Sequence, residues 1–242
     1  MVFDQDMERP GAAAMVYRHT ERTRRNAQEK EEAFLRAAHD LVARHGFAGA
    51  KVTAVAGACG ASAGSLYSYF GSRDELLARV FRRAADRELA AVRDAVSEAP
   101  ATAPARLDAL VSTFTRRALL GRRLAWSLLF EPVSPLVEEE RLRYRREYVA
   151  LGESIIGEGV AAKLFAQQNA YVAASAAIGA IAEALIGRLS PVVSGGTGTD
   201  LPDVQLVAEI RNFCFRALGY APDRPSTPAS EDRCPAPASS VP

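Results

Sequence analysis

Apolar residues recur at the three- and four-residue spacing of helices along most of this chain, which predicts an all-α protein. The shortest stripes lie within residues 52–76. They are formed by Val52, Val55 and Ala56, and then by Leu66, Tyr69 and Phe70. Gly60 between them suits a left-handed helix end, and Ser62 suits the N-cap of the following helix. Two short helices joined by so tight a turn form the helix-turn-helix pattern.

A longer helix is expected directly after this stretch. Gly71 interrupts the pattern, and Ser72 with Glu75 forms a capping box. The segment resembles the DNA-binding domain of the TetR/AcrR (tetracycline-repressor-like) family. The residues that carry the resemblance are Ala56, Gly60, Ser62, Gly64, Leu66, Tyr67, Tyr69, Phe70, Ser72 and Leu76, with Arg73 for the usual Lys. Two departures are Ala61, where Val is usual, and Lys51, which replaces a capping Thr or Ser and cannot accept a hydrogen bond.

Further amphipathic stripes flank the helix-turn-helix. They predict helices over about 26–45, 73–97, 107–120, 122–130, 135–156, 168–189 and 201–218, with Gly46 and Gly121 ending the first and third of them. The helix over 73–97 starts beside the helix-turn-helix and continues into the rest of the chain, so it can act as a lever. We therefore predict a DNA-binding domain at 19–72, a ligand-binding and dimerisation domain at 73–220, and disordered ends at 1–18 and 221–242.

The second short helix is expected to lie in the major groove, with its N-terminal residues nearest the bases. Its residues are small and uncharged, so phosphate contacts should supply much of the affinity. The arginine-rich run before the first helix either enters the minor groove and binds phosphates or is a solvated flank. The predicted DNA contacts are Arg22, Arg24, Arg25, Lys51, Thr53, Ser62, Ala63, Ser65, Tyr67, Ser68, Tyr69 and Arg73.

The predicted helix over 135–156 carries arginines within a broad apolar face. Burying an unpaired guanidinium costs roughly several kcal/mol, so Arg141 and Arg145 each need an anion. For Arg145 this is either a carboxylate or phosphate of a ligand, or an internal carboxylate such as Glu131 or Glu183. The predicted pocket lining is Phe114, Trp126, Phe130, Arg141, Tyr144, Arg145, Tyr148 and Leu151, for which a plain aromatic core is an equal alternative.

The last predicted helix has apolar residues on two faces, which is more than one neighbour would cover. The first face carries Val207, Ile210, Cys214 and Leu218, and the second carries Leu206 and Phe213. This pattern indicates a second chain. The resemblance likewise implies a homodimer in which the last two helices of each subunit, about 168–189 and 201–218, pair into a four-helix bundle.

Composition excludes several classes of function. The formal net charge of the 242 residues is +1, so DNA binding must rely on locally concentrated charge. The three histidines all precede residue 60, so the G-x-S-x-G match at 60–64 lacks the later His of a hydrolase triad. No catalytic group, metal site or cofactor is predicted. Cys59 is either a redox switch or, as we favour, a small buried residue.

The three scattered cysteines suit a reducing compartment, and no apolar run reaches the roughly 18 residues needed to span a membrane. These features predict a cytoplasmic bacterial protein, nucleoid-associated when DNA-bound. We expect a homodimeric repressor, released from a pseudo-palindromic double-stranded DNA operator by a small apolar effector that can be anionic. The alternative is an α-helical enzyme that retains a helix-turn-helix-like segment. The effector, the operator and the sign of regulation are open, and translation can start at Met1, Met7 or Met15.

Overall fold

The computed structural model describes residues 11–191 and 201–220, and within these ranges it contains helices and no strand, which confirms the predicted all-α class. The predicted disorder at 1–10 and 221–242 lies outside the described residues. The helices are α1 (Gly11–Gly49), α2 (Val52–Ala58), α3 (Ala63–Tyr67), α4 (Arg73–Glu98), α5 (Ala103–Leu120), α6 (Arg122–Leu129), α7 (Pro135–Ala161), α8 (Ala170–Leu189) and α9 (Asp203–Ala217).

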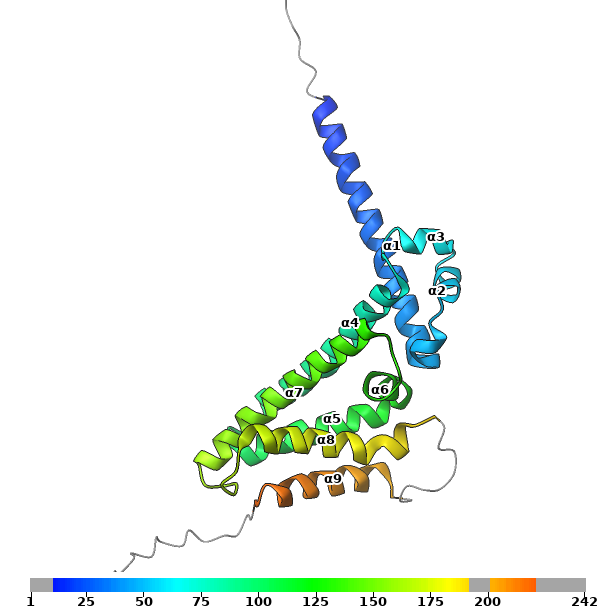
Figure 1. The fold of residues 1–242 in the computed structure, drawn as a ribbon. Helices are drawn as coiled ribbons and strands as arrows, with labels where there is room; N and C mark the ends of the chain where they lie inside the picture. Colours follow the sequence, from blue (N-terminus) through cyan, green and yellow to red (C-terminus); the bar gives the residue numbers. More distant parts are fainter. Residues whose placement is uncertain (1–10, 192–200, 221–242) are drawn as a thin grey trace, which may run out of the picture.

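The first helix is longer than its apolar stripe predicts. α1 begins at Gly11, not near residue 26, and includes residues 11–18, which the sequence predicts to be disordered. Alanine, arginine and glutamate favour helix, and neither Gly nor Pro interrupts residues 12–45. The N-terminal half of α1 extends away from the rest of the molecule (Figure 1). The helix is broken at Gly46, whose φ of 75° is accessible to glycine at little cost.

The three N-terminal helices enclose a small apolar core. Phe34, Leu66 and Phe70 are almost fully buried there, together with Val55. Arg73, at the start of α4, fastens this unit from the outside: its guanidinium donates to the backbone carbonyls of Ala50 (Nε–O 3.2 Å) and Phe47 (Nη2–O 2.6 Å). The first turn of α4 is therefore bonded to the end of α1.

The remaining helices form the larger part of the molecule. The long helices α4 and α7 run side by side, α5 and α8 pack across their far ends, and α9 packs against α5 and α8 (Figure 1). The short α6 lies against the end of α1 and also contacts α5 and α8. Because α4 and α6 both touch the helix-turn-helix unit, two separate elements join the two parts of the chain.

α8 is more apolar than the sequence analysis allowed. By length and composition alone it is long enough to cross a membrane: its best 18-residue window has a mean hydropathy of 1.6. This corrects the expectation that no such run exists, although one helix of this kind is weak support for a membrane span. Only 22% of that window is fully buried, and Tyr171 and Val172 at its start are exposed, so part of an apolar helix is left uncovered in the single chain.

Candidate DNA-binding surface and ligand cavity

Short side-chain hydrogen bonds hold α3 in place. The hydroxyl of Ser62 accepts from the backbone N–H of Ser65 (3.2 Å), as an N-cap should, and Ser68 donates to the carbonyl of Gly64 (3.2 Å). Gly60 has a φ of 62° in the turn before α3, as its position predicts. Lys51 precedes α2 without any side-chain capping bond, which leaves its ammonium group unused by the cap.

Most of the predicted DNA contacts share this outer surface. Tyr67 is 49% exposed, and α2 and α3 face away from the larger domain (Figure 1). Tyr69 differs, because its ring packs against Phe34 with centroids 5.7 Å apart and belongs partly to the core. The exposed residues of this surface are Lys51, Thr53, Ser62, Tyr67 and Ser68, while Ala63, Ser65 and Tyr69 are half-buried.

The structure bears on four of the predicted DNA contacts. The guanidinium of Arg73 connects α4 to α1 through the two bonds described above, and its contact with phosphate stays a prediction. Arg22, Arg24 and Arg25 are exposed but lie on the continuous helix α1. A helix is about 10–12 Å wide and the minor groove about 6 Å, so these arginines cannot enter that groove as a flexible arm would. From the surface of α1 these arginines can still contact DNA phosphates.

A cavity of about 270 Å³ lies in the larger domain between α4, α5, α6, α7 and α8. Six of the eight residues predicted to line a pocket line it: Phe114, Phe130, Arg141, Tyr144, Arg145 and Tyr148. Trp126 and Leu151 do not. The ring of Trp126 packs behind Phe130, with centroids 5.3 Å apart.

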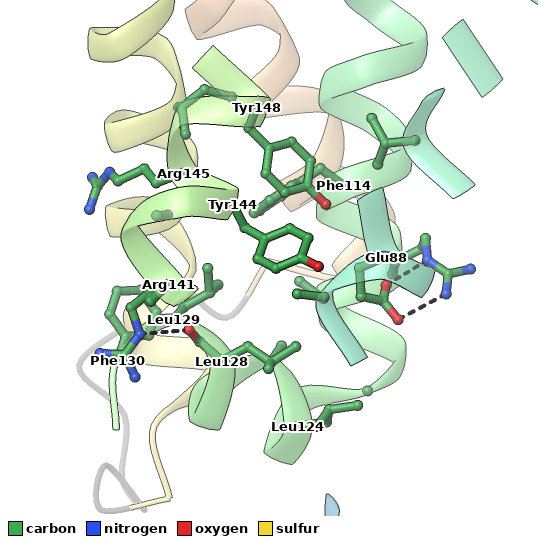
Figure 2. A pocket seen from close by; sticks show the side chains of 18 of the residues that line it. Glu88, Phe114, Leu124, Leu128, Leu129, Phe130, Arg141, Tyr144, Arg145 and Tyr148 are labelled. Atoms are coloured by element: carbon green, nitrogen blue, oxygen red, sulfur yellow. Dashed lines mark hydrogen bonds and ion pairs between the residues drawn. The ribbon is translucent and has the colours of Figure 1, made fainter. Parts of the chain in front are cut away.

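The sequence analysis missed the wall that α4 contributes. Phe81, Ala85, Glu88 and Val92 line the cavity, and Arg117 of α5 is paired with Glu88 beside them. These α4 residues recur every three or four positions, as residues on one face of a helix do. The charged Glu88 interrupts the apolar pattern of that face, so the sequence did not indicate it as a cavity wall. The Glu88 carboxylate accepts two hydrogen bonds from Arg117, at 2.6 and 2.9 Å, and the pair lies at the edge of the cavity (Figure 2).

Arg141 does not need the ligand that the sequence analysis considered for it. Its guanidinium donates to the backbone carbonyls of Leu128 (2.8 Å), Ser127 (3.3 Å) and Glu131 (2.7 Å) at the end of α6, and it pairs with the carboxylate of Glu138. These acceptors satisfy a largely buried cation. Arg141 therefore caps α6 and fixes it to α7.

Arg145 has neither of the internal partners proposed for it. The Glu131 carboxylate accepts instead from the backbone N–H groups of Phe47 and Ala48. Glu183 lines the same cavity, but no ion pair joins it to Arg145 in the part of the chain that the structure describes. Arg145 is exposed, and its guanidinium lies near Gly179 of α8. A cation beside the cavity is thus available to an anion.

The family model described as "Bacterial regulatory proteins, tetR family" matches residues 34–80, which contain the helix-turn-helix and the start of α4. The helix-turn-helix part of the chain is therefore similar to that of the TetR family of bacterial regulatory proteins. This confirms the resemblance noted in the sequence. A search of curated proteins finds no match.

Solved structures show the same fold for the greater part of this chain. The fatty acid degradation regulator FadR from Bacillus halodurans superposes with a TM-score of 0.65 at 20% identity, covering 79% of this chain and 97% of its own. FadR from Bacillus subtilis, in complex with stearoyl-CoA, gives 0.62 at 18% identity, covering 76% and 96%. AibR, in complex with isovaleryl coenzyme A and operator DNA, gives 0.59 at 19% identity, covering 76% and 97%.

The comparisons favour a regulator over the enzyme alternative. The family model that matches residues 34–80 describes bacterial regulatory proteins, and the structural neighbours named above are regulators. Ser62 of the G-x-S-x-G match caps α3 and is not a nucleophile on a strand-to-helix turn. Burial raises the pKa of Cys59, which disfavours the thiolate that a redox switch would need.

Proposed function

We propose that this chain is a TetR-family regulator, a homodimeric repressor that leaves its operator when a small apolar molecule binds in the cavity. In this proposal residues 19–72 bind DNA, residues 73–220 bind the ligand and the second subunit, and the protein works in the bacterial cytoplasm. The observation that carries it is that two cavity walls are bonded to the DNA-binding unit. α4 is bonded through Arg73, and α6 through Glu131.

The lining favours a ligand with an apolar body and an anionic end. Aromatic and aliphatic side chains make up most of the wall, and Arg145 supplies an unpaired cation beside it. The cavity is slightly below the range of about 300–1,000 Å³ typical of small-molecule sites, so only part of a large ligand would be enclosed. The acyl-CoA complexes of the structural neighbours have this chemistry, with an apolar acyl group and a phosphate-bearing remainder. We therefore propose an acyl-CoA or a related acidic lipid as effector.

An uncovered apolar face on the last two helices supports the dimer. Tyr171 and Val172 on α8 and Val204 and Phe213 on α9 are each at least 50% exposed. Pairing these faces between two subunits would remove them from water, which is favourable by about 25 cal/mol per Å² of apolar surface. A two-fold dimer would present two copies of α3 to half-sites about one helical turn, or roughly 34–36 Å, apart.

Release requires that the ligand prefer one arrangement of the subunits. A molecule that fits better when α4 and α6 are displaced shifts the population toward a spacing of the two α3 helices that the operator does not accept. The bonds at Arg73 and Glu131 transmit that displacement, because each connects a cavity wall directly to the end of α1.

An electrophoretic mobility shift assay with the DNA upstream of the gene tests the proposal. We expect sequence-selective binding that weakens steeply with salt and is reversed by isovaleryl-CoA or stearoyl-CoA. If the ligands strengthened DNA binding, the sign of regulation would be the opposite of the one proposed. Binding that neither ligand changes, with no heat of interaction in calorimetry, would contradict the acyl-CoA effector and leave DNA binding intact.

A further inference from the structure

The hydroxyl of Tyr148 lies at the cavity and has no hydrogen-bond partner in the part of the chain that the structure describes. Tyr148 is 92% buried, since its relative exposure is 8%, and it lines the cavity from α7. Its hydroxyl makes no hydrogen bond among the described residues, whereas the hydroxyl of the neighbouring Tyr144 bonds to Asp86 and to the carbonyl of Arg82. The hydroxyl is accessible from the cavity, so it can donate to a guest, and such a hydrogen bond contributes about 1 kcal/mol net.

The rest of the tyrosine is fixed in place. Its ring meets Phe114 edge to face, with centroids 5.2 Å apart and an interplanar angle of 86°. In Figure 2 both tyrosine rings project from α7 toward the side of Glu88, and Arg145 extends the opposite way. The cavity therefore has two polar ends of different character.

The end at Tyr148 is suited to an uncharged group. Glu88 pairs with Arg117 through two hydrogen bonds, and the nearby Arg93 pairs with Glu147, so no net positive charge remains there for an anion. Burial, and then the nearby Glu88 carboxylate, raise the pKa of Tyr148, so its hydroxyl stays protonated and can donate. A ligand carboxylate at this point would find no net positive charge to offset the cost of its desolvation, whereas a neutral carbonyl or hydroxyl oxygen would accept the hydrogen bond.

We propose that the hydroxyl of Tyr148 selects ligands that carry a neutral carbonyl or hydroxyl group on their apolar body, at the end of the cavity away from Arg145. This inference rests on the proposed ligand-binding function and specifies the chemistry of that site. The effector is then a molecule with two polar positions, a neutral oxygen at Tyr148 and an anionic group at Arg145.

The test uses a matched pair of probes, indane and 1-indanone, which differ only by a carbonyl oxygen, titrated into the full-length protein by calorimetry. We expect 1-indanone to bind about fivefold more tightly than indane, because a net hydrogen bond contributes about 1 kcal/mol. Tyr148→Phe keeps the ring against Phe114 and should abolish the preference, so that 1-indanone binds no more tightly than indane.

Tyr144→Phe is the matched control. Its hydroxyl is already used inside the protein, so the substitution should change both affinities by the same factor and keep their ratio. Equal affinities in the unsubstituted protein would show that water satisfies Tyr148, and an unchanged ratio in Tyr148→Phe would place the carbonyl elsewhere; either result overturns the inference and leaves the proposed function standing. If neither probe binds, the cavity accepts no apolar guest, and the ligand part of the proposed function fails with it.

Discussion

The carboxylate of Glu131, at the end of α6, accepts a hydrogen bond from the backbone N–H of Phe47, 84 residues earlier in the chain, at 3.1 Å. Its other oxygen accepts from the N–H of Ala48 at 3.0 Å. Both N–H groups follow the break at Gly46, where a Cβ atom would collide with the Glu131 carboxylate. The α6 helix is thus attached to the end of α1 by a buried carboxylate.

Replacing this carboxylate should destabilise the protein. Glu131→Ala leaves two N–H groups without acceptors, and we expect the free energy of unfolding to fall by about 2–3 kcal/mol. Chemical denaturation measures the change. Glu139→Ala, at an exposed position of α7, is the control and should stay within about 0.5 kcal/mol of the unsubstituted protein. Equal effects of the two variants would contradict the attachment.

Substitutions of Arg73 and Lys51 should distinguish a cation that stabilises the fold from one that binds DNA. Arg73→Ala removes two hydrogen bonds to backbone carbonyls and should lower stability by about 1–3 kcal/mol. Lys51→Ala should leave stability nearly unchanged, weaken operator binding, and reduce the slope of log affinity against log salt by about one. Thermal unfolding and salt-dependent mobility shifts distinguish them. A normal salt slope for Lys51→Ala would remove Lys51 from the DNA surface.

Arg141 and Arg145, four residues apart on α7, should behave differently. Arg141→Ala removes the donor for three backbone carbonyls and should cost about 3 kcal/mol of stability. Arg145→Ala should change stability by no more than about 0.5 kcal/mol, because the side chain is exposed and forms no ion pair in the described part of the chain. The same variant should weaken the binding of isovaleryl-CoA in calorimetry. Unchanged binding would disprove the anion site.

The exposed faces of α8 and α9 should control assembly. Phe213→Asp places a charge in the proposed interface and should convert a dimer into a monomer in light scattering after size-exclusion chromatography. Leu142→Asp, at an equally exposed apolar position on α7, is the control and should remain dimeric. A Phe213→Asp protein that stays dimeric would place the interface elsewhere.

Acid should weaken the contact between α4 and α7 at Glu140. Burial alone would raise the pKa of Glu140, but hydrogen bonds and charge from Arg82 and Arg143 outweigh it and lower the pKa below its ordinary value of 4.5. A lowered carboxylate pKa stabilises the fold above the unfolded value and loses that contribution as the pH falls through the folded value. Denaturation midpoints between pH 5 and 3 should therefore fall more steeply for the unsubstituted protein than for Glu140→Gln. Parallel curves would contradict this assignment.

The local sequence was sufficient to predict the elements and the family. Helix stripes, glycines in turns and serine caps depend on residues within a few positions of one another, so Ser62, Gly60 and the helix-turn-helix could be located without tertiary information. The helix boundaries over α4 to α9 agree with the predictions to within a few residues, except that α7 continues to Ala161. The extension of α1 to Gly11 was missed because it has no apolar stripe and rests on helix propensity.

The tertiary structure alone decided which polar groups meet. The stripe that contains Arg141 and Arg145 indicated two cations near an apolar face, but only the packing of α6 gave Arg141 its carbonyls and left Arg145 free of an ion pair in the described chain. The pairing of Glu88 with Arg117 and the unpartnered hydroxyl of Tyr148 likewise depend on helices far apart in sequence. Periodicity determines which face of a helix a residue occupies, whereas the neighbour on that face is fixed by how the helices pack.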